Sequence, residues 1–321
     1  MPSLFTSLAL VSALALPATA QLAQSSFAVG NDGWLNVTLQ YPSAIPVTEL
    51  ASYAPSWISS LGGYLKITDP DGTMPSGECQ YWKAPAAYLG DKSAAWCGTL
   101  QFDLADNPGS SAFTQEDILL LGNGLTLVHA IAPAPLPAFS HYSVPLSESG
   151  WKVGALAGPA ATAAQVQSVL GALDALYIRA EYFLAADIQF LDNVSLNAGP
   201  WTKLGFGLAG VSGVPSLIGS GTLVAGSPGS LSLSNARPSA PTILFISFAS
   251  TPLPFKGGTL ATVPVALTVS LATDAGGGFT LPWLWPAGIP SGFSLYFQCA
   301  VQDPAAVKGA SLSNALRGVT P

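Results

Sequence analysis

Short runs in which every second residue is apolar recur along this chain, and glycine or proline separates one run from the next. The run 32–41 is an example, with apolar residues at Leu35, Val37 and Leu39. This period of two is typical of a β-strand with one buried face. Glycine and proline supply 33 and 27 of the 321 residues, yet 49% of the chain is hydrophobic. A disordered chain lacks so many apolar residues, so the pattern predicts an all-β protein with short strands.

One helix and one tight hairpin are predicted among these strands. Thr162 and Gln165 have the spacing of a capping box. Apolar residues then follow at helical spacing, which predicts a helix over 163–174. Asn123 and Gly124 lie between two apolar runs. An Asn-Gly pair in this position predicts a two-residue β-hairpin.

Charge and glycine content divide the chain into two predicted domains. Residues 21–199 contain fifteen acidic and five basic side chains, a net charge of −10. Residues 200–321 contain two acidic and five basic side chains, a net charge of +3. The change coincides with the glycine-rich stretch 198–220, which we interpret as the boundary that opens the second domain. The predicted domains are residues 25–197 and a smaller β-sandwich over 200–321.

Residues 1–20 have the features of a secretory signal peptide. An apolar run precedes Ala18-Thr19-Ala20, a small-x-small cleavage site. The run is too short to span a bilayer comfortably, so we expect cleavage after Ala20 and a secreted, extracellular protein. No later stretch predicts a membrane span. The net charge of −7 also provides no basic surface for nucleic acid.

The chain has three cysteines, and export would permit a disulfide. We expect a bridge between Cys79 and Cys97, which flank an aromatic stretch that begins at Tyr81. Three buried free thiols are the alternative. Cys299 shares strand parity with apolar neighbours, so it should stay reduced and point into the second core.

Several short sequence motifs in the first domain resemble those of one known extracellular module. They include "YWKAPAAYLGD" at 81–91, "LQFDL" at 100–104 and "LYIRAEY" at 176–182. On this basis residues 25–196 resemble the laminin domain IV (laminin B) module. The resemblance implies an extracellular, jelly-roll-like β-sandwich without known catalytic residues. The predicted fold is therefore all-β, a jelly-roll-like β-sandwich with one short helix followed by a second, smaller β-sandwich.

The second domain resembles a C-terminal module of secreted bacterial proteins. The motifs "LYFQCAVQD" at 295–303 and "SNAL" at 313–316 are the basis of this resemblance, which implies no activity. In the first domain, Cys97 stands where the laminin module usually has a glycine, and Cys79 is also unusual there. These departures favour the pairing of the two cysteines.

The sequence offers little sign of catalysis. His129 lies in an apolar alternation and is interpreted as structural, whereas His141 lies in a more accessible loop. No G-x-S-x-G elbow is present, and the histidines and cysteines lack zinc-ligand spacing. "GFGLAG" at 205–210 matches G-x-G-x-x-G but has no βαβ context, so we interpret it as part of the boundary.

Two kinds of binding residue are candidates. Trp82, Tyr88 and Trp96 could stack on a sugar, although the resemblance favours a scaffold role for these rings. Four turn aspartates are weak candidates for a structural calcium ion, with ordinary solvated turns as the alternative. They are Asp32, Asp69, Asp71 and Asp192.

Three functions are compatible with these features. The first is a secreted, non-catalytic binding or adhesion protein whose partner is an extracellular glycan or a component of the envelope or matrix. The second is a carbohydrate-active hydrolase with an unrecognised carboxylate pair. The third is a structural surface-layer protein.

Overall fold

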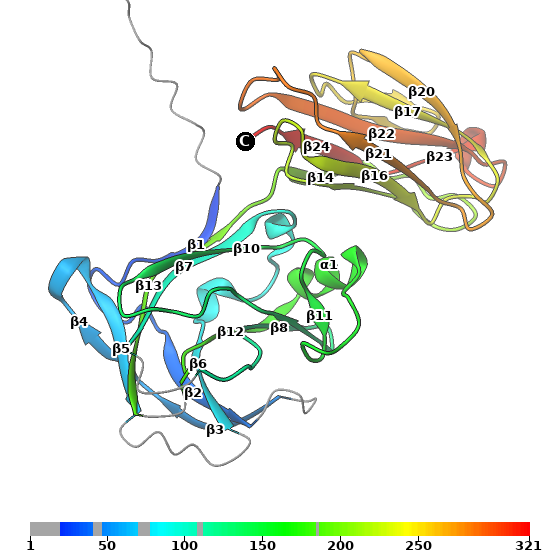
Figure 1. Cartoon of the computed structure of the whole chain (residues 1–321). Helices are drawn as coiled ribbons and strands as arrows, with labels where there is room; N and C mark the ends of the chain where they lie inside the picture. The colour runs from blue at the N-terminus through cyan, green and yellow to red at the C-terminus, as the bar shows by residue number, and fades with distance from the viewer. Residues whose placement is uncertain (1–19, 41–46, 70–77, 108–111, 184–185) are drawn as a thin grey trace, which may run out of the picture.

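A computed structural model describes residues 20–40, 47–69, 78–107, 112–183 and 186–321. The fold is all-β, as predicted, and its strands form two β-sandwich domains (Figure 1). Strands up to Asn197 belong to the first domain, and strands from Trp201 onward belong to the second. The predicted signal peptide lies outside the described residues, apart from Ala20. In the described ranges, no helix is both long and apolar enough to cross a membrane.

Two antiparallel sheets face each other in the first domain. In spatial order, sheet A contains β10 (Ser140–Pro145), β7 (Thr99–Asn107), β13 (Asp187–Asn197), β5 (Tyr64–Asp69) and β4 (Ser56–Ile58), and β1 (Gln21–Ser25) also pairs with β13. Sheet B contains β11 (Lys152–Val153), β9 (Leu125–His129), β8 (Ile118–Gly122), β12 (Leu173–Arg179), β6 (Glu78–Lys83), β2 (Leu35–Gln40) and β3 (Thr48–Tyr53).

The alternation in the sequence decides which side chains fill the space between these sheets. In β7, Leu100, Phe102 and Leu104 are buried in the main core, whereas Gln101 and Asp103 on the other face are partly exposed. Successive side chains of a strand point to opposite faces. The period of two therefore gives sheet A one core face and one outer face.

The predicted hairpin is confirmed, and the predicted helix is confirmed except at its end, because Leu173 already begins β12. Asn123 and Gly124 connect β8 to β9 with positive φ angles of 48° and 71°, as a type I′ turn requires. Helix α1 spans Ala163–Gly171, and Thr162 and Gln165 form the complete capping box at its start. Short 3-10 helices occur at Ser60–Gly62, Ala86–Tyr88, Ser93–Ala95 and Val307–Gly309.

The outer face of sheet B carries a second, smaller apolar cluster. Val37, Leu39, Cys79 and Tyr81 are buried there, and the partly buried Leu156 packs against them. Tyr81 also donates a 2.7 Å hydrogen bond to a backbone carbonyl. Alternation along a strand predicts that Tyr81 and Trp82 point to opposite faces, one toward the core and one outward. Instead, both are buried, because sheet B has apolar packing on both of its faces.

The second domain is built from two further antiparallel sheets and one separate hairpin. Sheet C contains β14 (Trp201–Gly205), β24 (Ala315–Val319), β22 (Ser294–Gln302), β17 (Pro241–Ser247) and β20 (Leu267–Ala272), and β23 (Ala310–Leu312) pairs with β22. Sheet D contains β15 (Ser216–Ser220), β16 (Pro228–Ser234) and β21 (Phe279–Leu284), and the hairpin joins β18 (Leu253–Phe255) to β19 (Gly258–Leu260). Cys299 is buried between the sheets as a free thiol, as predicted.

Candidate functional site

The three aromatic residues named as sugar-stacking candidates are buried. Trp82 and Tyr88 are fully enclosed in the main core, and Trp96 is 5% exposed. The Tyr88 hydroxyl donates a 2.9 Å hydrogen bond to the carbonyl of Val194 in β13. The rings of Trp82 and Tyr88 offer no face to a ligand, and that of Trp96 is almost fully buried, so the scaffold interpretation describes their packing and sugar stacking on these rings is not supported.

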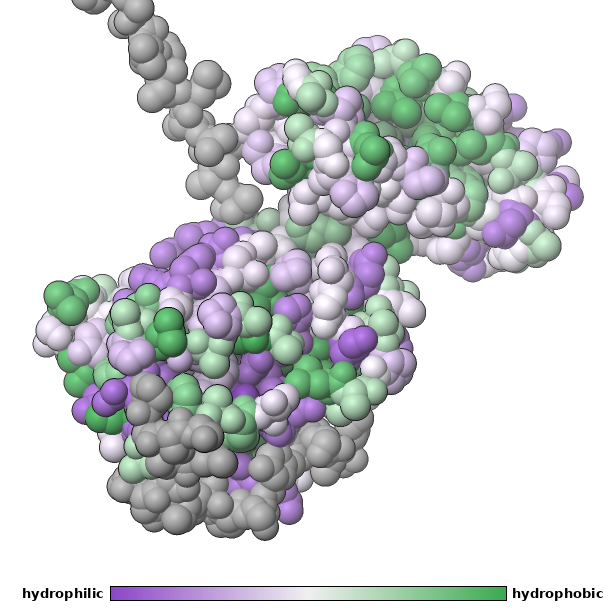
Figure 2. Space-filling model, viewed as in Figure 1, coloured by the Kyte–Doolittle hydropathy of each residue, from purple (hydrophilic) through white to green (hydrophobic). Residues whose placement is uncertain are grey.

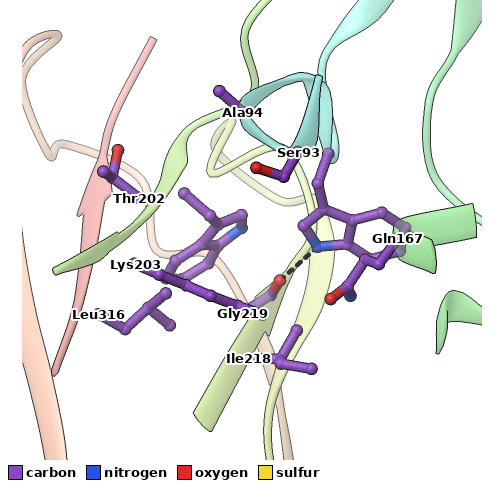
Figure 3. Close-up of a pocket in the computed structure, with 10 residues that line it drawn as sticks. Ser93, Ala94, Gln167, Thr202, Lys203, Ile218, Gly219 and Leu316 are labelled. Atoms are coloured by element: carbon purple, nitrogen blue, oxygen red, sulfur yellow. Dashed lines mark hydrogen bonds between the residues drawn. The ribbon is translucent and has the colours of Figure 1, made fainter. Parts of the chain in front are cut away.

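Trp96 joins the two domains. Its indole nitrogen donates a 2.8 Å hydrogen bond to the carbonyl of Gly219 in β15 (Figure 3). The ring borders a cavity of about 190 Å³ between the domains. Ser93 and Gln167 line it from the first domain, and Ile218 lines it from the second. The cavity is small and bordered by packed rings, and we assign it a role in domain packing.

The expected disulfide is absent. Cys79, Cys97 and Cys299 are all free and buried. Cys79 lies in the cluster on the outer face of sheet B, whereas Cys97 lies in the main core next to the second domain. The two thiols belong to separate apolar clusters and therefore do not pair. The stated alternative, three buried free thiols, is the observed state.

The four candidate calcium ligands do not come together as one site. The Asp32 carboxylate accepts a hydrogen bond from the Phe27 backbone N–H at 3.2 Å, which is an ordinary turn contact. Asp192 lies on the outer face of sheet A. Asp69 ends β5, and Asp71 lies outside the described residues. Among the described residues, no group of three His, Cys, Asp or Glu side chains could hold a metal ion.

The outer face of sheet A is the surface with the most binding chemistry. The backbone register places His141 of β10 opposite Asp103 of β7, and Asp103 opposite Asp192 of β13. Directly opposed residues of neighbouring strands have side chains on the same face. A polar row therefore crosses three adjacent strands. Figure 2 shows hydrophilic side chains gathered where Figure 1 labels β1 and β7.

Hydrogen bonds hold this polar row in place. His141 Nδ1 lies 2.7 Å from Asp103 Oδ1, and Asn193 Nδ2 donates to Asp103 Oδ2 at 2.8 Å. Partial burial raises the pKa of Asp192, and a 2.7 Å hydrogen bond from the Asn193 backbone N–H opposes that shift. The row thus presents fixed donors and acceptors at the surface.

An aromatic cluster lies on the same sheet. Tyr64 of β5 packs edge-on against Phe190 of β13 with ring centroids 5.7 Å apart, and Phe139 contacts both rings at 5.8 and 6.3 Å. Phe139 is 43% exposed, whereas the other two rings are partly buried. Lys66 lies opposite Phe190 in the register. An exposed ring beside a polar row is suited to a ligand with both apolar and hydroxyl surfaces.

The histidines occupy the environments expected of them. His129 is partly buried, its ring lies 5.1 Å from that of Trp151, and burial lowers its pKa. His141 has a side chain that is mostly exposed. The His141–Asp103 pair has two members of a hydrolase triad, but no hydrogen bond from a serine to His141 is found among the described residues.

Sequence reasoning missed this surface. Tyr64, Phe139 and Phe190 come from three separate segments, and nothing in a single sequence indicates that they meet. The alternation of β5 and β13 could have placed Tyr64 and Phe190 off the core, because their immediate neighbours Leu65 and Leu191 are apolar and buried. The cross-strand register that assembles the row was not readable from the sequence.

One family model matches part of the chain. Residues 81–205 match the family model described as laminin B (domain IV). The basement membrane-specific heparan sulfate proteoglycan core protein of Mus musculus is 32% identical over 124 residues, 37% of this chain and 3% of that protein. The basement membrane proteoglycan of Caenorhabditis elegans is 30% identical over 135 residues, 41% of this chain and 4% of that protein. The chain thus spans a very small part of these relatives.

Two solved structures are similar at a lower level. The L4b domain of human laminin alpha-2 has a TM-score of 0.44 and 14% identity, and covers 57% of this chain and 100% of that chain. The family 11 carbohydrate-binding module of the cellulosomal cellulase Lic26A-Cel5E of Clostridium thermocellum has a TM-score of 0.35 and 16% identity, and covers 56% of this chain and 96% of that chain. The family match ends at residue 205, so the bacterial resemblance of the second domain stays a prediction.

Proposed function

Because residues 81–205 carry a match to the laminin B (domain IV) family, we propose that this chain is an extracellular, non-catalytic binding protein whose ligand is a glycan. The ligand lies on the outer face of sheet A. The observation that carries this proposal is the exposed Phe139 ring beside the polar row of His141, Asp103 and Asp192. Basement membrane relatives support an extracellular setting.

The chemistry of this face suits a saccharide. One face of a sugar ring carries C–H groups that pack on an aromatic ring, and its edge carries hydroxyls that need hydrogen-bond partners. Phe139 supplies the ring, and Tyr64 and Phe190 hold it in place. Asp103 and Asp192 accept hydrogen bonds from hydroxyls, and Lys66 donates to them. The acidic row also disfavours an anionic glycan, so the preferred ligand is neutral.

The test is a glycan-array screen of the chain lacking residues 1–20, followed by calorimetric titration of the best neutral oligosaccharide. Phe139→Ala should weaken binding by about 1–3 kcal/mol, the usual cost of removing a ring from the centre of a binding surface. Its melting temperature should stay near the wild-type value, because the ring is 43% exposed. Tyr53→Ala is the matched control, since Tyr53 is 61% exposed on sheet B. Equal losses in the two variants would refute the site.

The hydrolase alternative has one observation in its favour. Asp103 and Asp192 are directly opposite on neighbouring strands, which places their Cβ atoms about 5 Å apart, close to the carboxyl spacing of retaining glycosidases. However, both oxygens of Asp103 already bind His141 and Asn193. A carboxylate whose two oxygens are both held by hydrogen bonds is a poor nucleophile. If the wild type releases reducing sugar and Asp192→Asn does not, the chain is a hydrolase and the proposal of a non-catalytic binding protein is wrong.

The surface-layer alternative draws on the second domain. Apolar side chains are exposed on and beside β17 and β20, where Figure 2 shows a hydrophobic area. Ile243, Phe248 and Leu267 are among them. Large exposed apolar patches are typical of contact surfaces. Sedimentation of the chain over a range of concentrations separates the two ideas, because a monomer that binds glycan supports the proposal and open-ended assembly supports the structural role.

A further inference from the structure

One end of the first sandwich encloses an unusual number of buried acidic side chains. Among the described residues of this domain, five carboxylates are buried together with a single guanidinium. They are Asp106, Glu116, Asp117, Glu181 and Asp187, and the base is Arg179. A buried charge is costly unless it is paired or hydrogen-bonded. Each of these carboxylates therefore needs a partner.

Four of the five carboxylates have a protein partner. Asp117 lies 3.2 Å from Arg179 and accepts the Ile131 backbone N–H at 2.8 Å. Glu116 accepts the backbone N–H of Leu156 at 3.1 Å. Glu181 accepts that of Gln80 at 3.1 Å.

Asp187 accepts a hydrogen bond from the side-chain amide of Gln189. Asp106 differs from these four. It is 1% exposed, and within the described part of the chain neither of its carboxylate oxygens makes a hydrogen bond of good geometry, although the nearby Tyr182 backbone N–H lowers its pKa.

A second unpartnered oxygen lies on the neighbouring strand. Gln189 is also 1% exposed, its amide nitrogen donates to Asp187, and its Oε1 has no partner among the residues that the structure describes. The register of β7 and β13 places Gln189 directly opposite Asp106. Both point to the interior face, because Leu104 and Leu191, two positions away from each, are in the core. When Asp106 is ionised, three oxygens that can only accept are thus enclosed at one place.

We propose that this place is a calcium site, in which the Asp106 carboxylate and the Gln189 side-chain carbonyl bind the ion and Asp187 adds negative charge beside it. Calcium accepts carboxylate and amide oxygens together and tolerates irregular geometry. Magnesium requires a near-ideal octahedron and keeps most of its water. Zinc prefers nitrogen and sulfur ligands. Two carboxylates and one carbonyl on adjacent strands therefore favour calcium, at the affinity of extracellular modules.

The surroundings set the strength of this site. Arg179 is near enough to Asp106 to lower its pKa, but it makes its side-chain hydrogen bonds to other groups, including Asp117 and Glu181. Burial is the larger effect and raises the pKa of Asp106 to about 7. Protons and calcium therefore compete for the same oxygens, and calcium should bind more weakly as the pH falls below 7.

The experiment uses the chain without residues 1–20, purified in EGTA. Calcium is added, and binding is followed by calorimetry and by the melting temperature. Extracellular modules have dissociation constants of about 10⁻⁴–10⁻³ M. Calcium at about 100-fold above that constant should raise the melting temperature by on the order of 5–10 °C. The rise should be much smaller with the same concentration of magnesium.

Two variants test the location. Asp106→Asn should weaken calcium binding by about tenfold or more, because it removes a charged ligand. Asp174→Asn is the control, since Asp174 is exposed on β12 in the other sheet, and it should bind calcium as the wild type does. Equal binding by Asp106→Asn and the wild type would overturn the proposal.

A readout on the wild type keeps the proposal testable even if Asp106→Asn does not fold. Terbium should bind in place of calcium, show luminescence sensitised by the nearby aromatic side chains, and be displaced by calcium. If calcium neither stabilises the wild type nor displaces terbium, while lower pH alone stabilises it, a proton satisfies Asp106 and the calcium site does not exist.

Discussion

The indole N–H of Trp96, in the first domain, donates a 2.8 Å hydrogen bond to the backbone carbonyl of Gly219, in the second. The approach of the chain around this contact is very close. A Cβ on Gly199 would lie 1.8 Å from the Trp96 carbonyl oxygen, and a Cβ on Gly98 would lie 2.1 Å from the Asn197 carbonyl oxygen. Only glycine fits at both positions. The ring and these glycines together fix how the first domain meets the second.

Trp96→Ala should destabilise the chain and weaken the coupling between its domains. The Trp96 side chain is only 5% exposed, and removal of a buried Trp costs roughly 3–5 kcal/mol. We expect one cooperative calorimetric transition to split or broaden, because the domains no longer unfold together. Tyr53→Ala, which removes an exposed ring, should leave the transition unchanged. A Trp96→Ala variant with a wild-type transition would show that the ring does not couple the domains.

Arg179→Ala should be far more damaging than loss of a surface ion pair. The guanidinium lies 4.3 Å from the centre of the Phe113 ring and 4.5 Å from that of Tyr182, and it pairs with the buried Asp117. Removal of one partner leaves a buried charge uncompensated, at a cost of about 3–5 kcal/mol. Lys83→Ala breaks the partly exposed pair with Glu49 and should cost less than about 1 kcal/mol. Urea unfolding measures both, and similar values would contradict the buried pairing.

The local features of this fold were readable from the sequence because they depend on near neighbours. The capping box of Thr162 and Gln165 and the Asn123-Gly124 turn each require only a few consecutive residues. Alternation likewise found most of the long strands. It could not say what covers a strand's second face, and so one ring of the Tyr81–Trp82 pair was expected to be exposed on a sheet that is in fact packed on both sides.

The candidate site was beyond sequence reasoning for a related reason. Trp96 was considered as a ligand contact, but its partner Gly219 lies 123 positions away in another domain. The row of His141, Asp103 and Asp192 also depends on pairings between distant strands. The expected Cys79–Cys97 bridge failed in the same way, because closeness in sequence did not place the two thiols in one cluster.

The three thiols should be unreactive in the folded chain. Burial raises the pKa of Cys79 and of Cys97 to about 12 and also raises that of Cys299. The thiolate is the reactive form, and all three side chains are buried. A thiol reagent at pH 8 should therefore label none of them rapidly in the native state and all three after denaturation. Only one labelled residue in the denatured, unreduced chain would indicate a disulfide and contradict the structure.

In calcium-free buffer, Asp106 should make the stability of the first domain fall as the pH rises from about 4 to 7. Burial raises its folded-state pKa to about 7, above the value of about 3.9 for an unfolded chain. Between these values the folded state holds a proton that the unfolded state has released. The free energy of unfolding must therefore decrease with pH in this window and level off above it. Carboxylates with lowered pKa values, such as Glu49, make the free energy of unfolding rise with pH instead.

The quantity to measure is thus the difference in the free energy of unfolding between the wild type and Asp106→Asn, from urea unfolding at several pH values. This difference should favour the wild type most at low pH and shrink toward pH 7, and a difference that grows with pH would show that Asp106 is charged in the folded state throughout.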